Sequence, residues 1–294
     1  MTTGGRGCRS RWWHAVHFGV RPGRCRCALA ADSPRAAASS AEYVVRMLPH
    51  PDMLKAVLLG GDGVIHAAPH PAIVVDMSTS GPLAVRDCAT RLAEAGIGMV
   101  DALVGKGPWA AEKGELSILL GGEDNLCQRV EPLLRHIGNT IYRCGPLGSG
   151  QAVKLANNLA SCANIAVAVE AWTLAARTGA DVNVLKEVMP QTSADSWQLR
   201  HTLIGKVLCG DFAPMFKLSL AHKDLRLIAD LADTLNVPIN TTRGAIDWYE
   251  KAMAAGHGDL DWGAIALVED PNLFVTAVQA LPSGQASSGS TLCE

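Results

Sequence analysis

The sequence of 294 residues lacks an excess of charge of either sign, with 26 basic residues, 28 acidic residues and a net charge of −2. Nothing in this balance indicates a nucleic-acid-binding protein. The chain also lacks an apolar run of the roughly 18–20 residues that a membrane span requires. The nearest approach, residues 160–176, is interrupted by Asn164 and Glu170. We therefore expect neither nucleic acid nor a membrane as a partner.

The cysteine and histidine patterns of a metal site or a disulfide framework are missing too. The nine cysteines are scattered, and the one close pair is Cys25 and Cys27. The histidines show no metal-ligand spacing, so we expect no metal. Such cysteine usage is typical of a reduced, intracellular protein, and we expect a cytoplasmic location.

A third absence concerns residues 1–35, where no strand-like run leads into a G-x-G-x-x-G turn. The segment holds seven arginines and a single acid, Asp32, and its composition changes abruptly near Ala36. It is atypical, with three interpretations: an irregular or disordered extension, a stretch translated in a wrong reading frame, or a transit peptide. Glycines, prolines and cysteines weigh against the amphipathic helix of a transit peptide.

From residue 36 to 146, short apolar strands alternate with helices of about a dozen residues. Strands are predicted at 43–48, 73–76, 98–104, 116–120 and 140–143, and helices at 52–59, 83–95 and 124–135. This order predicts the α/β class, a Rossmann-type parallel sheet covered on both faces, with its first βαβ unit degraded or missing. Residues 147–269 predict an all-α domain built on a long interdomain helix, and 270–294 a flexible tail.

The long helix is predicted from Ser149, a candidate N-cap, and no proline or glycine interrupts it between Gln151 and Arg177. It carries four polar residues at i, i+3, i+4 and i+7, which therefore share one face: Lys154, Asn157, Asn158 and Ser161. Burying polar groups without partners is costly, so this polar stripe is either solvated or lines a pocket. Its composition favours the pocket.

Lys154 is the candidate for proton transfer within the polar stripe. A lysine shielded from water has a lowered pKa and can exchange a proton with a substrate oxygen. The alternative is a surface lysine whose stem covers apolar side chains. Two neighbouring amides and a hydroxyl favour the first interpretation.

Three candidate site loops directly follow predicted strands. In open α/β sheets, ligands bind at the carboxyl ends of the strands. The loops are Leu48-Pro49, Ser78-Thr79 and Gly105-Lys106. Taken alone, Ser78-Thr79 favours a plain helix-starting turn over a binding site. Lys223, beside Asp224 in a predicted helix at 218–235, either reaches the same pocket or forms a weak surface ion pair.

Four ordered motifs share a family likeness that spans residues 36–268. They are Val-Asp-Met-Ser-Thr-Ser-Gly-Pro at 75–82, the strand-loop-strand at 101–122, Gly-x-x-x-Lys-x-x-Asn-Asn ending at Asn158, and Lys-Asp-Leu at 223–225. Together they resemble the β-hydroxyacid dehydrogenase family, in particular its 3-hydroxyisobutyrate dehydrogenase-like group. In that family a Rossmann domain binds the cofactor and a helical domain supports a dimer or tetramer.

The resemblance implies an NAD(P)-dependent oxidoreductase that interconverts a small 3-hydroxy acid and its aldehyde by hydride transfer. It implies NAD or NADP as cofactor, a small anionic hydroxy acid or aldehyde as substrate, and a homodimer or homotetramer. Lys154 would be the general acid/base and Asn158 would orient the substrate. The resemblance further implies substrate contacts from Ser78, Gly105, Lys106, Asn157 and Ser161, and cofactor contacts from Leu48, Pro49, Thr79 and Lys223.

Two departures from the family pattern leave alternatives open. The usual Ser-Gly-Gly loop is here Gly105-Lys106-Gly107, and with Asn157 and Ser161 it resembles the sulfolactaldehyde reductase branch, in which a basic residue holds a sulfonate. The missing G-x-G-x-x-G turn suggests a cofactor-impaired, catalytically silent homologue that binds or dimerises. It also leaves NAD and NADP undistinguished, because the residue that reads the ribose 2′ position belongs to that region.

Overall fold

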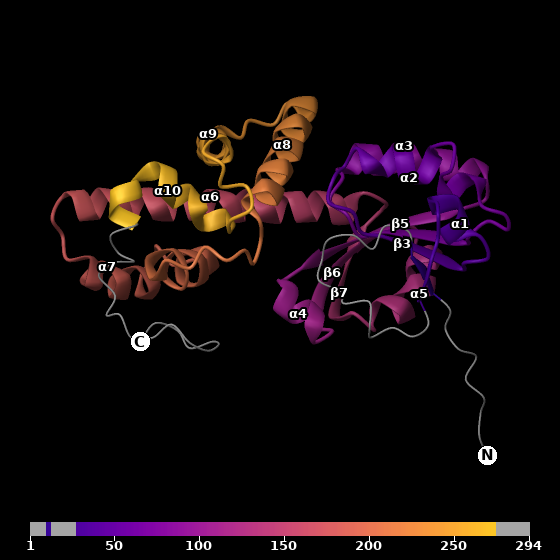
Figure 1. Ribbon diagram of the computed structural model, residues 1–294, viewed down its shortest axis with the longest axis horizontal. Coiled ribbons are helices and arrows are strands. Elements are labelled where there is room, and N and C mark those ends of the chain that lie inside the picture. Colours follow the sequence, from indigo (N-terminus) through magenta and orange to yellow (C-terminus); the bar gives the residue numbers. More distant parts are fainter. Residues whose placement is uncertain (1–9, 13–27, 275–294) are drawn as a thin grey trace, which may run out of the picture. The chain divides into compact units, whose positions relative to one another are not determined.

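The computed structural model describes residues 10–12 and 28–274 (Figure 1). The chain divides into two compact units, Met1–Lys154 and Leu155–Glu294. Residues 1–9 and 13–27, most of the segment set apart by its composition, lie outside the described residues. Within the described part of that segment, β1 (Ser10–Trp12) and β2 (Ala28–Ala30) pair in parallel as a separate two-stranded sheet.

The first unit is built on a five-stranded sheet with the order β3-β4-β5-β6-β7. Its strands are β3 (Tyr43–Arg46), β4 (Ile73–Asp76), β5 (Gly98–Gly105), β6 (Leu116–Gly121) and β7 (Gly138–Gly145). Neighbours are parallel except β5 and β6, which are antiparallel. Here the structure differs from the expected fully parallel sheet. The link at 106–115 is shorter than the dozen or more residues that a parallel crossover needs.

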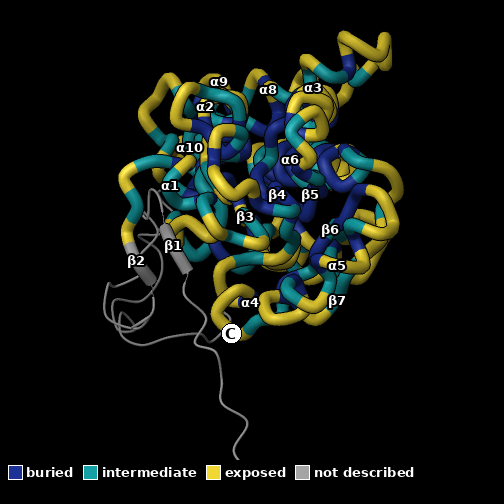
Figure 2. The backbone as a smooth tube through the Cα atoms, turned by 90° about the vertical axis from the view of Figure 1, so that its right-hand side faces the viewer, coloured by how far each residue is buried: buried dark blue, intermediate teal, exposed yellow. Residues whose placement is uncertain are grey.

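Helices cover both faces of this sheet. α2 (Met53–Leu59) and α3 (Pro82–Glu94) lie on one face, and α5 (Asp124–Leu134) lies on the other (Figure 1). Successive residues of β4 alternate between the faces: Val74 packs with α2 and α3, whereas Ile73 and Val75 pack with α5. Figure 2 shows β4 and β5 as buried. Burial on both faces explains why β4 reads as a continuous apolar run.

The remaining elements of the first unit are short. They are α1 (Pro34–Ala38), a 3₁₀ turn at Val64–His66, and α4 (Pro108–Glu112) between β5 and β6. The N-terminus of α1 is capped by Ser33, whose hydroxyl accepts the Ala36 N–H at 3.1 Å.

The second unit is all-α and is organised around α6 (Ser149–Arg177), which begins in the first unit. α7 (Val182–Val188), α8 (Leu218–Leu235), α9 (Asn240–Ala254) and α10 (Ala266–Glu269) complete it. Ile165, Val169 and Trp172 of α6 share one core with Leu225 of α8 and Tyr249 of α9. The regular helix predicted at 193–208 is instead a π turn at Leu199–Ile204 and a 3₁₀ turn at Val207–Cys209, separated at Gly205.

Within the described part of the chain, α6 is the one helix long and apolar enough to cross a membrane by length and composition. Its most apolar 18-residue window has a mean hydropathy of 1.5. A share of 33% of that window is buried, and Leu155, Cys162 and Val169 of the helix belong to the core of the second unit.

The start of the predicted flexible tail is packed. Arg177 at the end of α6 donates through Nε to the buried Asp270 at 2.8 Å. Phe274 is fully buried in the second core. The serine- and glycine-rich composition that suggested a flexible tail begins only beyond this aromatic anchor. Residues 275–294 lie outside the described residues.

The N-terminus of α6 is held against the sheet by Asp101 of β5. The Asp101 carboxylate accepts the Gly148 N–H at 2.8 Å and the Gln151 N–H at 2.7 Å. The expected cap from Ser149 is thus replaced by a distant one, because Ser149 already lies inside the helix. A Cβ on Gly150 would lie 2.5 Å from the Leu119 carbonyl oxygen, so the close approach of helix and sheet requires glycine.

We predict that Gly150→Ala lowers the free energy of unfolding by about 1–3 kcal/mol, because the added methyl meets backbone that cannot move aside. Gly244 of α9 is the matched control, since a Cβ there meets nothing within 4 Å. Gly244→Ala should raise stability by about 0.5–1 kcal/mol through helix propensity. Urea unfolding of both variants measures the opposite signs. Equal changes would show that the approach at Gly150 is not tight.

Candidate active site

A row of charged side chains crosses three neighbouring strands of the first unit. Arg46 of β3 is in register with Asp76 of β4, and Asp76 is in register with Asp101 of β5. Side chains at paired positions point to the same face of a sheet. All three are buried, with exposed fractions of 3%, 0% and 0%. Arg46 and Asp76 are the last residues of their strands, so the row lies where ligands of such sheets bind.

The row is stabilised by an ion pair and by backbone donors. Arg46 Nη1 donates to Asp76 Oδ1 at 2.7 Å and to Ser80 Oγ at 3.2 Å. Burial raises the pKa of Asp76 to about 6, although the Arg46 guanidinium and the Ser78 N–H act in the opposite direction. Burial also raises the pKa of Asp101 against the stabilising N–H groups at the start of α6. Desolvation therefore exceeds the favourable contacts at both carboxylates.

The loops after β3 and β4 meet at this edge. The Leu48 N–H donates to Ser78 Oγ at 2.7 Å. Ser78 is buried, Thr79 is half-buried and Pro49 is exposed. The structure thus brings together Leu48 and Ser78, two of the residues predicted to contact cofactor and substrate.

The third predicted loop makes a different contact. Lys106 follows β5 with a φ of 67°, in the left-handed region, and its side chain is exposed. Its ammonium donates to the Glu115 carbonyl oxygen at 2.8 Å. Lys106 therefore belongs to the link between β5 and β6, and the half-buried Gly105 is the last residue of β5. The contact with Glu115 does not join Lys106 to Ser78.

Gln151, which the sequence analysis did not select, fastens the loop after β4 to α6. Its Oε1 accepts the Ser80 N–H at 3.0 Å and the Gly81 N–H at 3.1 Å. Its Nε2 donates to the Ser78 carbonyl oxygen at 2.8 Å. The available signal was its spacing, because Gln151 precedes Lys154 by three residues and shares its helix face. Lys154 itself is half-buried and is the last residue of the first unit.

In the second unit, a buried polar cluster forms on the polar stripe of α6. Asn158 is 4% exposed and donates through Nδ2 to Asp224 Oδ2 at 2.6 Å. The other oxygen of Asp224 lies 2.8 Å from Lys223 Nζ. Asn157 is exposed and donates to Asn158 Oδ1 at 3.2 Å, and Ser161 is half-buried. Asp224, missed in the sequence except as the neighbour of Lys223, joins two of the predicted site residues.

Two protein-family models match consecutive parts of the chain. The NAD-binding domain of 6-phosphogluconate dehydrogenase matches residues 15–145, and the NAD-binding domain of NADP-dependent 3-hydroxyisobutyrate dehydrogenase matches residues 148–268. The first match begins inside the segment 1–35, further toward the N-terminus than the motifs at 36–268 indicate. The two matches meet between β7 and α6.

Named proteins of similar sequence align with most of this chain. It is 36% identical over 252 residues to 3-sulfolactaldehyde reductase of Escherichia coli K12, covering 86% of this chain and 82% of that protein. The chain belongs to the β-hydroxyacid dehydrogenase family. It is 32% identical to 3-hydroxyisobutyrate dehydrogenase of Pseudomonas aeruginosa, covering 74% of each. The solved 3-hydroxyisobutyrate dehydrogenase of Mycobacterium tuberculosis with L-serine is 26% identical with a TM-score of 0.73, covering 83% and 84%.

Membership makes this chain an oxidoreductase of the 3-hydroxyacid dehydrogenase type, with NAD or NADP as cofactor. The solved relatives also confirm the Rossmann-type sheet followed by a helical domain. Within the described residues, no group of three or more His, Cys, Asp or Glu side chains is placed to hold a metal ion.

The residues at the carboxyl ends of β3 and β4 fit one part of the cofactor site. Nε and Nη2 of the buried Arg46 have no hydrogen-bond partner within residues 10–12 and 28–274, so donors for an anion remain beside the Leu48 and Ser78 loops. A glycine-rich G-x-G-x-x-G turn, which holds the diphosphate in such folds, is not found in those same ranges. The described residues that fit a cofactor site are therefore those in the loops after β3 and β4.

We predict that the Arg46–Asp76 pair makes stability depend on pH between about 4 and 6. The folded protein keeps the Asp76 proton up to a pKa of about 6, whereas the usual value is 3.8. The folded state therefore binds more protons in this window, and the free energy of unfolding falls as the pH rises through it. The contribution is on the order of 3 kcal/mol, since one pKa unit corresponds to about 1.4 kcal/mol.

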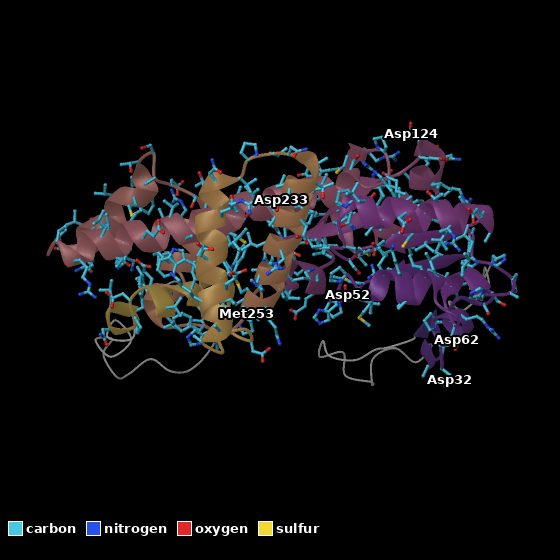
Figure 3. The ribbon with its side chains drawn as sticks, turned by 90° about the horizontal axis from the view of Figure 1, so that it is seen from above. Asp32, Asp52, Asp62, Asp124, Asp233 and Met253 are labelled. Carbon is cyan, nitrogen blue, oxygen red and sulfur yellow. The ribbon has the colours of Figure 1, made fainter. Side chains whose placement is uncertain are left out.

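The double variant Arg46→Met/Asp76→Asn removes both charges while keeping their approximate volumes. It should lack this part of the pH dependence, and urea midpoints at pH 4, 5, 6 and 7 compare it with the wild type. Asp52→Asn serves as a control, because Asp52 is an exposed residue at the start of α2 with no side-chain capping bond (labelled in Figure 3). Parallel pH profiles for wild type and double variant would contradict the raised pKa of Asp76.

Proposed function

We propose that this protein interconverts a small anionic 3-hydroxy acid, similar to 3-hydroxyisobutyrate, and the corresponding aldehyde, with Lys154 as general acid/base. The observation that carries the proposal is the buried cluster of Asn158, Asp224 and Lys223. It lies on the helix face to which Lys154 belongs, one turn away along α6. A solvated stripe would not bury an amide and a carboxylate in this way.

The proposed chemistry divides between cofactor and protein. The nicotinamide, when bound, exchanges a hydride with the substrate carbon that bears the hydroxyl group. Lys154 takes the hydroxyl proton when the alcohol is oxidised and returns it when the aldehyde is reduced. Asn158 orients the substrate with its second amide hydrogen, because the first is directed to Asp224. Asp224 keeps the amide in this orientation.

The other site residues are assigned from the resemblance to the family. We assign contacts with the substrate to Ser78, Gly105, Asn157 and Ser161, and contacts with the cofactor to Leu48, Pro49, Thr79 and Lys223. The hydrogen bond between Leu48 and Ser78 supports a joint role for the first two loops.

Lys154→Met should lower kcat by at least about 100-fold, the scale of a lost general acid/base, with little change in the Kd of the cofactor. Lys113→Met is the control, since Lys113 is exposed at the end of α4. The assay follows nicotinamide absorbance with a panel of 3-hydroxy acids at alkaline pH. Wild-type activity retained by Lys154→Met would refute the assignment.

Fluorescence titration of the wild type with NADH and NADPH separates an active enzyme from the cofactor-impaired homologue. Micromolar affinity supports the enzyme and identifies the preferred cofactor. Absence of binding together with absence of turnover would favour the silent homologue.

A second candidate substrate is sulfolactaldehyde. Lys106 at the end of β5 supports it, as does the similarity to 3-sulfolactaldehyde reductase. The ammonium of Lys106 is a point charge on a flexible stem, so it can exchange its bond to the Glu115 carbonyl for a sulfonate oxygen. This assignment changes the substrate and leaves the role of Lys154 as it is.

On this second assignment, Lys106→Ala should raise the KM for sulfolactaldehyde by about tenfold or more, the scale of a lost charge-assisted hydrogen bond. The KM for a simple uncharged aldehyde should stay within about twofold, because no anionic group is present to lose its partner. Steady-state kinetics with both substrates measures the difference, and Lys113→Ala is the control. Equal increases for both substrates would exclude Lys106 as a sulfonate ligand.

The proposal also covers the assembly of the protein and its location in the cell. We expect a homodimer or homotetramer in the cytoplasm. Val167 and Leu174, seven residues apart on α6 and 57% and 71% exposed, support an apolar contact surface on that helix. Light scattering of the purified protein gives the assembly state.

A further inference from the structure

Both polar atoms of the Gln151 side-chain amide form hydrogen bonds with one loop, residues 78–81. The side chain is fully buried in the first turn of α6. Its oxygen accepts the N–H groups of Ser80 and Gly81, and its nitrogen donates to the Ser78 carbonyl. This pattern fixes the orientation of the amide, because only its oxygen can accept two N–H groups.

Few other side chains could replace this amide. Methionine has a similar length but leaves two N–H groups and one carbonyl without partners, each at a cost of about 1–3 kcal/mol when buried. An ionised glutamate accepts both N–H groups but places a carboxylate oxygen against the Ser78 carbonyl. A protonated glutamic acid restores the pattern, since its O–H group donates where the amide N–H group did.

The backbone of Gln151 is fixed independently of its side chain. Its N–H donates to Asp101 Oδ2 at 2.7 Å, which holds the first turn of α6 against β5. The loop at 78–81 is held from its other side, because Ser78 accepts the Leu48 N–H. Gln151 is thus a cross-link between a fixed helix turn and the loop that carries Ser78 and Thr79.

We propose that Gln151 is a positioning residue for hydride transfer, which sets the loop at 78–81 relative to Lys154. This inference rests on the proposed function, in which that loop contacts substrate and cofactor and Lys154 moves the proton. Lys154 lies three residues after Gln151, on the same face of α6. A loop displaced by about 1 Å would lower the rate by up to about 100-fold without removing any reacting group.

The test compares two buried glutamines. Gln198 is 6% exposed and accepts the Thr202 hydroxyl at 2.7 Å in the second unit, so Gln198→Met is the matched control. Gln151→Met should lower kcat by about 10- to 100-fold while the substrate KM changes by less than about threefold. Gln198→Met should leave kcat within about threefold, since the hydrogen bond that it removes is to Thr202 within the second unit. Similar losses of kcat in both variants would show that the role of Gln151 is structural only.

Gln151→Glu adds a pH signature that a purely structural role would not give. Burial raises the pKa of a glutamate at this position, so the acid is protonated and donates to the Ser78 carbonyl at lower pH. The kcat deficit relative to wild type should therefore be smallest at low pH and grow as the pH rises. A deficit that is constant with pH would overturn the proposed hydrogen-bond role.

Amide hydrogen exchange of the free protein gives a readout that needs no turnover. Peptides containing Ser80 and Gly81 should exchange at least about tenfold faster in Gln151→Met than in wild type or Gln198→Met, because their N–H groups lose the acceptor. Unchanged exchange would show that Gln151 does not hold the loop, and changed exchange with unchanged kcat would overturn its positioning role. A wild type without any turnover would refute the proposed function, and exchange would then decide alone whether Gln151 fixes the loop.

Discussion

The Asp101 carboxylate is the contact on which the arrangement of the first unit depends. It projects from β5 and accepts two N–H groups at the start of α6, and a negative charge at a helix N-terminus is favourable. The helix can approach the sheet this closely because Gly121 and Gly150 have no side chain: a Cβ on either residue would lie 2.5 Å from an oxygen atom of Asp101 or Leu119. The strand, the two glycines and the first turn of α6 therefore form one constraint.

The polar groups proposed to position the ligands lie next to this contact between β5 and α6. Gln151 is the next residue of α6 after the close approach, and it ties the loop at 78–81 to the helix. The Arg46–Asp76 pair belongs to the same charged row as Asp101, and Arg46 donates a hydrogen bond to Ser80. Polar groups in this region are thus fixed by other polar groups, and such networks are costly when only partly satisfied. The loops that carry Leu48 and Ser78 are therefore joined to each other and to α6 by hydrogen bonds.

Most strands and helices follow from local sequence patterns. β4 and α8 begin and end at the predicted residues, and most other strands and helices of the two units differ by one to three residues. The predictions failed where local patterns carry no information. The apolar pattern of a strand does not encode the direction of its neighbour, as in the antiparallel pair β5 and β6, and the irregular turns at 199–209 lie on either side of Gly205.

Four features can be recognised from the amino-acid sequence: the alternating α/β order, the family motifs, the candidate roles of Lys154 and Asn158, and the missing dinucleotide fingerprint near the N-terminus. Periodicity and spacing are properties of nearby residues, so they can be recognised without coordinates. Only the tertiary structure showed that Asp101 caps α6, that Gln151 holds the loop after β4, and that Asp224 joins Asn158 to Lys223. Apart from the ion pair between the chain neighbours Lys223 and Asp224, these contacts link residues far apart in the chain, and folding alone brings their polar groups within hydrogen-bonding distance.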